Sequence, residues 1–146
     1  MLDDIFIDND DIIYQKNGQI RTCDDYLYGY CHLFALSLKE VFGSRAEIVS
    51  VWQWEERNEE YESGYLAHSY VCIDNDYFID ARGIIDKATI KEEYFMNEED
   101  VDQVEDSHCF LHSYIKDGFF EDFLPDEKEQ IMDFISKNIL VYDIDN

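Results

Sequence analysis

The stretch Tyr28-Gly-Tyr-Cys-His-Leu-Phe-Ala-Leu-Ser-Leu-Lys-Glu-Val-Phe-Gly43 decides the fold. Its apolar residues are spread around the whole helical circumference instead of along one stripe, which is typical of a helix buried inside a domain. We therefore predict a central helix over about residues 30–42. Gly43 suits the left-handed position that commonly ends a helix.

Cys31 falls in the first turn of this predicted helix. The backbone N–H groups of a first turn have no partner inside the helix, and the positive end of the helix dipole lies there. Both effects favour a thiolate over a thiol. The sequence thus indicates an activated nucleophile at Cys31, although a free cysteine is also common as a small buried apolar residue.

Composition indicates one folded domain over residues 1–146 with a strongly acidic surface. The chain is 46% apolar and carries 35 acidic against 11 basic side chains, a formal net charge of −24. Such a charge repels phosphates, so we expect no direct binding to nucleic acid and none to anionic membranes. It favours a basic protein or peptide as partner, or mimicry of a polyanion; the simpler alternative is a solvated acidic surface that keeps the protein soluble.

The N-terminus lacks a basic segment followed by an apolar one, and no apolar run approaches the ~20 residues that cross a bilayer. The four cysteines show no C-x-x-C spacing, which favours reduced thiols; they are Cys23, Cys31, Cys72 and Cys109. We expect a cytoplasmic protein.

Turn signals and β-branched runs predict the elements around the central helix. Asn17-Gly18 predicts a turn that joins Asp11–Tyr14 to Gln19–Thr22 in a hairpin, and residues 46–54 are rich enough in β-branched and aromatic residues for a strand. Glu55–Gly64 has no apolar periodicity and is predicted to be an exposed loop. Residues 1–14 are compatible with a short strand or a docked arm.

In the C-terminal half, residues 86–96 predict a short helix and Glu98–Asp106 an acidic connector. Residues 107–116 fit a helix or a strand equally well. Pro125 suits the start of an amphipathic helix, and residues 139–144 predict a final strand. The apolar side of that amphipathic helix comprises Ile131, Met132, Phe134 and Ile135.

The clearest hairpin spans residues 68–83 and carries a histidine on one strand and an aspartate on the other. A three-residue loop at 74–76 pairs Tyr70 with Asp80, and side chains at 68 and 70 share a face because a strand repeats every two residues. Asp80 is then diagonal to His68 on one face, within reach of a long side chain. A two-residue loop would send the two side chains to opposite faces.

The order of these residues resembles the papain-like superfamily, and more narrowly its transglutaminase-like branch. The matching segments are Gly29–Ala35, His68–Val71 and Tyr77–Asp80. The resemblance implies an α+β fold whose central Cys-bearing helix packs against an antiparallel β-sheet. It also implies Cys31 as nucleophile, His68 as general base and acid, and Asp80 as the carboxylate that orients the histidine.

One position departs from the family pattern. Papain-like proteases often place a glutamine six residues before the cysteine to bind the oxyanion, and this chain has Asp25 there. A carboxylate is a poor hydrogen-bond donor to an anion. The backbone N–H of Cys31 must then serve, with Trp52, Gln53 or Tyr30 as candidate helpers.

The remaining polar residues have plainer interpretations. His32 is expected to point away from Cys31 on the helix, Asp80 could simply pair with Arg82, and Cys23 and Cys72 look structural. His108 and His112 have the i, i+4 spacing of metal ligands, but no carboxylate completes the set. We expect neither a metal nor an organic cofactor.

Together these observations predict thiol-dependent acyl transfer on an amide through a thioester at Cys31, which covers proteolysis, glutamine deamidation and transglutamination. The alternative is a non-catalytic acidic protein that mimics nucleic-acid phosphates or caps a basic protein surface.

Overall fold

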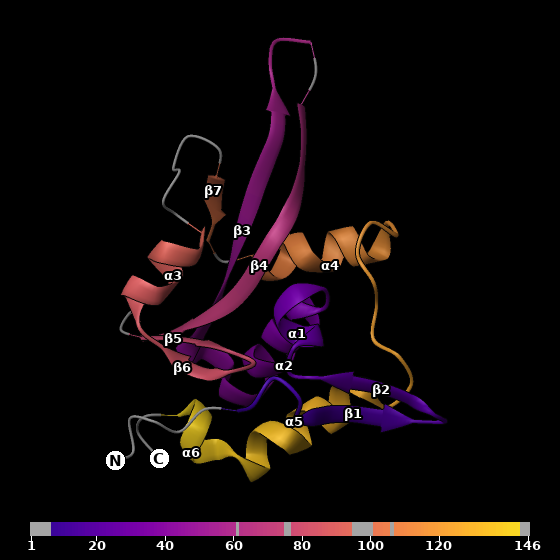
Figure 1. The fold of residues 1–146 in the computed structure, drawn as a ribbon. Helices are drawn as coiled ribbons and strands as arrows, with labels where there is room; N and C mark the ends of the chain where they lie inside the picture. The colour runs from indigo at the N-terminus through magenta and orange to yellow at the C-terminus, as the bar shows by residue number, and fades with distance from the viewer. Residues whose placement is uncertain (1–6, 61, 75–76, 95–100, 106, 144–146) are drawn as a thin grey trace.

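The computed structural model describes residues 7–60, 62–74, 77–94, 101–105 and 107–143 (Figure 1). Helix α2 (Cys31–Phe42) lies at the centre, and every residue from Cys31 to Leu38 is buried. It ends where Gly43 adopts a φ of 64°, a conformation that residues with a Cβ rarely adopt. The predicted buried helix and its glycine stop are confirmed.

A five-stranded antiparallel sheet packs against α2. The strand order is β6-β5-β4-β3-β7. The strands are β3 (Ala46–Arg57), β4 (Glu62–Ile73), β5 (Tyr77–Asp80), β6 (Gly83–Ile85) and β7 (Val101–Val104). The predicted α+β arrangement, with the Cys-bearing helix against an antiparallel sheet, is confirmed at this level.

Both faces of the sheet are buried, each against a different part of the chain. Along β4, Val71 and Ile73 belong to the core that includes α2, whereas Tyr70 and Cys72 belong to a second cluster with Ile90. This alternation follows the two-residue period of a strand. Ile90 lies on helix α3 (Lys87–Tyr94), which begins beside Asp86 as predicted; residues 95–96 of that prediction lie outside the described ranges.

The N-terminal hairpin is attached to the C-terminal helices. Strands β1 (Ile12–Lys16) and β2 (Gln19–Thr22) pair around Asn17-Gly18 as predicted. The further helices are α1 (Asp25–Tyr28), α4 (His108–Lys116), α5 (Glu127–Lys137) and α6 (Ile139–Tyr142). None of the helices in the described ranges is long and apolar enough to cross a membrane.

Buried Glu127 at the start of α5 holds this attachment together. Its carboxylate accepts two hydrogen bonds from Arg21 at 2.9 and 2.7 Å and one from the Tyr26 hydroxyl at 2.6 Å. The backbone N–H of Leu124 donates a fourth at 2.7 Å. Four hydrogen bonds satisfy a charge that would otherwise be costly to bury. On α5 itself, Ile131 and Ile135 are buried, whereas Met132 and Phe134 are half-buried.

The predicted loop at Glu55–Gly64 is wrong over most of its length. Strand β3 continues to Arg57 and β4 begins at Glu62, so the two form a long arm that extends away from the helices (Figure 1). Residues such as Glu55, Glu56 and Glu62 are exposed on this arm. Neither face of this arm packs on a core, so backbone hydrogen bonds between the strands hold it together. The sequence therefore shows no alternation of apolar and polar residues there.

The predicted acidic connector is also corrected. Residues 101–104 form β7, which pairs with β3 at the sheet edge and buries Val101. Residues 98–100 and 106 lie outside the described ranges. Acidic side chains are tolerated because an edge strand with one exposed face needs few apolar residues.

The C-terminal assignments differ as well. Residues 139–142 form helix α6, not a strand: Tyr142 is buried and its hydroxyl donates a 2.8 Å hydrogen bond to the Ala81 carbonyl. Periodicity does not distinguish a short apolar run in a strand from one in a helix. Residues 107–116 fit a helix or a strand by sequence, and the structure shows a helix, α4.

Candidate active site

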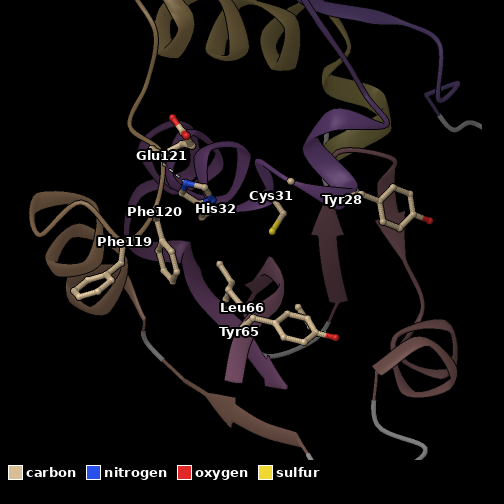
Figure 2. A pocket seen from close by; sticks show the side chains of 10 residues that line it. Tyr28, Cys31, His32, Tyr65, Leu66, Phe119, Phe120 and Glu121 are labelled. Atoms are coloured by element: carbon tan, nitrogen blue, oxygen red, sulfur yellow. Dashed lines mark hydrogen bonds between the residues drawn. The ribbon is translucent and has the colours of Figure 1, made fainter. Parts of the chain in front are cut away.

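Cys31 is the first residue of α2, and its side chain faces a cavity of about 310 Å³. Only 5% of Cys31 is exposed. Figure 2 shows its sulfur pointing into the ring of cavity residues, toward Leu66. The rim is aromatic, with Tyr28 74% exposed and Phe119 73% exposed. A reactant therefore reaches the sulfur through this cavity.

His68 lies on β4, completely buried, next to an irregularity in the sheet. Val51 pairs with His68 but Trp52 pairs with Leu66, so Ala67 is an extra residue in β4. Bulges of this kind re-aim side chains and are frequent beside active sites. The His68 ring stacks on the Tyr94 ring with centroids 4.9 Å apart and planes inclined by 9°, which fixes its orientation.

His68 and Asp80 meet as the hairpin register requires. Ile73 pairs with Tyr77, the register of a three-residue loop, and His68 Nε2 lies 3.0 Å from Asp80 Oδ2. The prediction that both side chains share one face is confirmed. A carboxylate only accepts, so Nε2 donates this hydrogen bond.

Asp80 is itself held in place by Arg82. The Arg82 backbone N–H donates to Asp80 Oδ1 at 2.9 Å, and the guanidinium donates to both oxygens, at 3.2 Å from Nε and 2.8 Å from Nη2. Burial raises the pKa of Asp80, but hydrogen bonds from His68 and Arg82 outweigh this and lower it. Asp80 therefore remains ionised and keeps accepting from His68.

The second nitrogen of His68, Nδ1, is buried and forms no hydrogen bond of ordinary geometry with any described residue. Since Nε2 is taken by Asp80, Nδ1 is the ring nitrogen left for proton exchange with the Cys31 thiol, which interacts with this imidazole. Loose contacts of this kind are common in unliganded catalytic sites. His68 is thus bonded to Asp80 through Nε2 and interacts electrostatically with the Cys31 thiol.

Electrostatics favour a thiolate–imidazolium pair. Burial raises the pKa of Cys31, but interactions with His32 and His68 outweigh it and lower the pKa to about 6. Burial lowers the pKa of His68, but hydrogen bonding to Asp80 and Cys31 raises it to about 9. Between these values the proton resides on His68 and the sulfur is a nucleophile.

The structure narrows the candidates for oxyanion binding. Asp25 is occupied, since its carboxylate accepts from the backbone N–H of Thr22 at 2.8 Å. Neither Trp52 nor Gln53 is among the described residues that line the cavity, and the ring of Tyr30 lies under the Arg21 guanidinium. The backbone N–H of Cys31, in the first turn of α2, remains as a candidate donor.

The expectation that His32 points away from Cys31 is wrong. Both residues line the cavity, as Figure 2 shows, and the interaction with His32 helps to lower the pKa of the Cys31 thiol. His32 Nε2 lies 2.8 Å from the Glu121 carbonyl oxygen, a residue 89 positions away in sequence. Nothing local in the sequence signals a contact between such distant segments.

The other cysteines and histidines lie elsewhere. Cys23 and Cys72 are buried, in keeping with a structural role, and Cys109 is exposed. His108 and His112 face each other on α4 with their Nε2 atoms 3.2 Å apart. Within the described part of the chain, no group of three His, Cys, Asp or Glu residues is placed to hold a metal ion.

Comparison of the chain with protein-family models, with curated proteins and with solved structures finds no match.

Proposed function

We propose that this protein catalyses acyl transfer on an amide through a thioester at Cys31, in the manner of the papain-like superfamily and its transglutaminase-like branch. The observation that carries the proposal is the buried His68–Asp80 hydrogen bond beside Cys31, whose pKa His68 helps to lower and whose side chain lines an open cavity. A purely structural cysteine needs neither a histidine held by a buried carboxylate nor access to a reactant.

In the first half-reaction the Cys31 thiolate attacks the amide carbonyl carbon and forms a C–S bond. The negative charge on the carbonyl oxygen is met by the Cys31 backbone N–H at the positive end of α2. As the C–N bond breaks, His68 Nδ1 gives its proton to the leaving amine. The products of this step are a thioester and a free amine.

Asp80 acts through His68. Its hydrogen bond to Nε2 keeps a proton on that nitrogen, so that Nδ1 is the nitrogen that exchanges protons with the sulfur and the amine. Tyr94 stacks on the ring and limits its rotation. Positioning of this kind contributes to catalysis without direct contact with the substrate.

The acceptor determines the overall reaction. Water gives hydrolysis, which is proteolysis of a backbone amide or deamidation of a glutamine, and an amine gives transfer. The acidic surface favours a basic peptide or protein as substrate, because a net charge of −24 attracts cations.

The test uses a synthetic peptide that contains glutamine, lysine and arginine. Mass spectrometry and ammonia release after incubation, with and without added methylamine, distinguish cleavage, deamidation and transfer. Cys31→Ser should abolish every product, whereas Cys109→Ser, which alters the exposed cysteine on α4, should retain full activity. Equal activity of the wild type and Cys31→Ser would refute the proposal.

The exposed carboxylates on the β3–β4 arm favour a second candidate, a non-catalytic protein that covers a basic surface. Its binding to a basic protein would survive Cys31→Ser and weaken steeply with salt. The two candidates therefore respond oppositely to the loss of the thiol.

A further inference from the structure

Two histidines interact electrostatically with the Cys31 thiol, and they differ in access to the cavity. His68 is 0% exposed and is not among the described residues that line the cavity. His32 lines it together with Cys31 (Figure 2). A water molecule or amine that enters the cavity after the first half-reaction therefore lies beside His32.

The hydrogen bond of His32 determines which of its nitrogens is available. The Glu121 carbonyl oxygen can only accept, so His32 Nε2 carries the hydrogen of their 2.8 Å contact. In the neutral ring Nδ1 then holds the lone pair. The Phe120 ring, with its centroid 5.4 Å from that of His32, packs against the imidazole and holds it beside Cys31.

We propose that His32 is the general base of the second half-reaction, which takes a proton from the acceptor as it attacks the thioester. This inference rests on the proposed function and divides proton transfer between two histidines: His68 protonates the leaving amine, and His32 deprotonates the acceptor. Both roles are catalytic, because each ring exchanges a proton with a reacting group.

The protons balance over one turnover. The acceptor loses a proton to His32 Nδ1 while its oxygen or nitrogen bonds to the thioester carbon, and the C–S bond breaks to release the Cys31 thiolate. The proton on His32 then passes to the sulfur and from the sulfur to His68 Nδ1. This restores the starting thiolate–imidazolium pair, with the thiol as relay between the two rings.

The experiment uses p-nitrophenyl acetate, an activated ester that acylates a thiolate without help from an acid. The initial burst of p-nitrophenol reports acetylation of Cys31, and the following steady rate reports hydrolysis of the thioester. His32→Gln retains an amide N–H for the Glu121 carbonyl but has no base. We expect a full burst and a steady rate lower by about 100-fold or more.

A second probe distinguishes loss of the general base from distortion of the site in His32→Gln. Hydroxylamine is a strong nucleophile that needs little deprotonation, so it should clear acetyl-Cys31 from His32→Gln nearly as fast as from the wild type. His32→Asn, which loses the Glu121 contact as well, should show the same slow steady rate in water. It provides the same comparison if the glutamine variant does not fold.

The outcomes of this experiment are distinct. A wild-type steady rate in both variants would overturn the role of His32 and leave the proposed function intact. Slow clearance by hydroxylamine would also overturn it, because a structural defect would then explain the loss. Failure of the wild type itself to become acetylated at Cys31 would refute the thioester chemistry, and with it the proposed function.

Discussion

Alkylation of the cysteines by iodoacetamide at two pH values separates Cys31 from an ordinary thiol. The reference is Cys109, which is exposed on α4. Cys23 and Cys72 are buried, and burial raises the pKa of Cys23 to about 12, so neither competes at neutral pH. The quantity measured is the ratio of the Cys31 rate to the Cys109 rate, read by peptide mass mapping.

Two effects act on this ratio in opposite directions. The larger ionised fraction of Cys31 raises it, and the lower intrinsic nucleophilicity of a thiolate with a low pKa reduces it. With a pKa of about 6, half of Cys31 is ionised at about pH 6, against about 0.3% of a thiol with the ordinary pKa of ~8.5, an advantage of about 150-fold. A thiolate with a pKa lower by ~2.5 units is, however, about 13-fold less nucleophilic. Cys31 should therefore react about 12-fold faster than an ordinary thiol near pH 6.

Near pH 8 the order reverses. Cys31 is then fully ionised and gains nothing more, whereas about a quarter of an ordinary thiol is thiolate, so Cys31 should be about 3-fold slower. Restricted access to the cavity lowers the Cys31 rate equally at both pH values. The fall in the ratio, about 40-fold from pH 6 to pH 8, is therefore independent of access.

His68→Gln is the matched variant, because glutamine retains a donor for Asp80 but carries no charge. It should raise the pKa of Cys31 and flatten the fall in the ratio. A ratio that stays constant between the two pH values in the wild type would refute the thiolate at Cys31 and the catalytic argument built on it.

Three further predictions concern the surroundings of the site. Asp80→Asn should lower acyl transfer by about 100-fold or more, because an amide neither fixes the His68 tautomer nor stabilises its charge; steady-state kinetics measure this, and an unchanged kcat would contradict it. Glu127→Gln should destabilise the fold by about 3–5 kcal/mol in urea unfolding, since it leaves Arg21 buried without a counter-charge, whereas Asp133→Asn, in an exposed pair, should cost under about 0.5 kcal/mol. Moderate salt should raise the melting temperature by screening repulsion among the 35 carboxylates; a flat or falling curve would mean that they are compensated locally.

Local sequence patterns predict those parts of the site that lie within a single helix or a single hairpin. The all-round apolar pattern predicts the buried helix that carries Cys31, and the three-residue alternative for the hairpin loop gives the register that joins His68 to Asp80. Strand periodicity then assigns both side chains to one face without further information. The elements with strong periodic or turn signals were therefore predictable from sequence alone.

Contacts between distant segments were not predictable in this way. The bond from His32 to the Glu121 carbonyl joins α2 to the segment before α5, and a carbonyl acceptor is the same in every residue. The bond from Arg21 to Glu127 spans 106 positions between two residues of ordinary type. Such pairs depend on how the elements pack, which no single stretch of sequence encodes.

The acidic surface does not determine the ionisation of Cys31. Within the site each anion has a cationic partner: His68 opposes the thiolate, and Arg82 opposes both Asp80 and the exposed carboxylate of Glu93. Exposed carboxylates farther away are screened over ~8 Å at physiological salt. The pKa of Cys31 is therefore lowered by the nearby histidines even though the chain has a net charge of −24.

The same surface field acts over longer range on a reactant that is still approaching. For the lysine- and arginine-containing glutamine peptide, added salt should therefore lower kcat/KM by slowing association and leave kcat unchanged. Steady-state kinetics at several salt concentrations measure both constants, and an uncharged glutamine peptide, whose kcat/KM should not respond, is the control. A parallel fall in kcat would show that the acidic side chains act on the chemical step, contrary to the pairing of charges within the site.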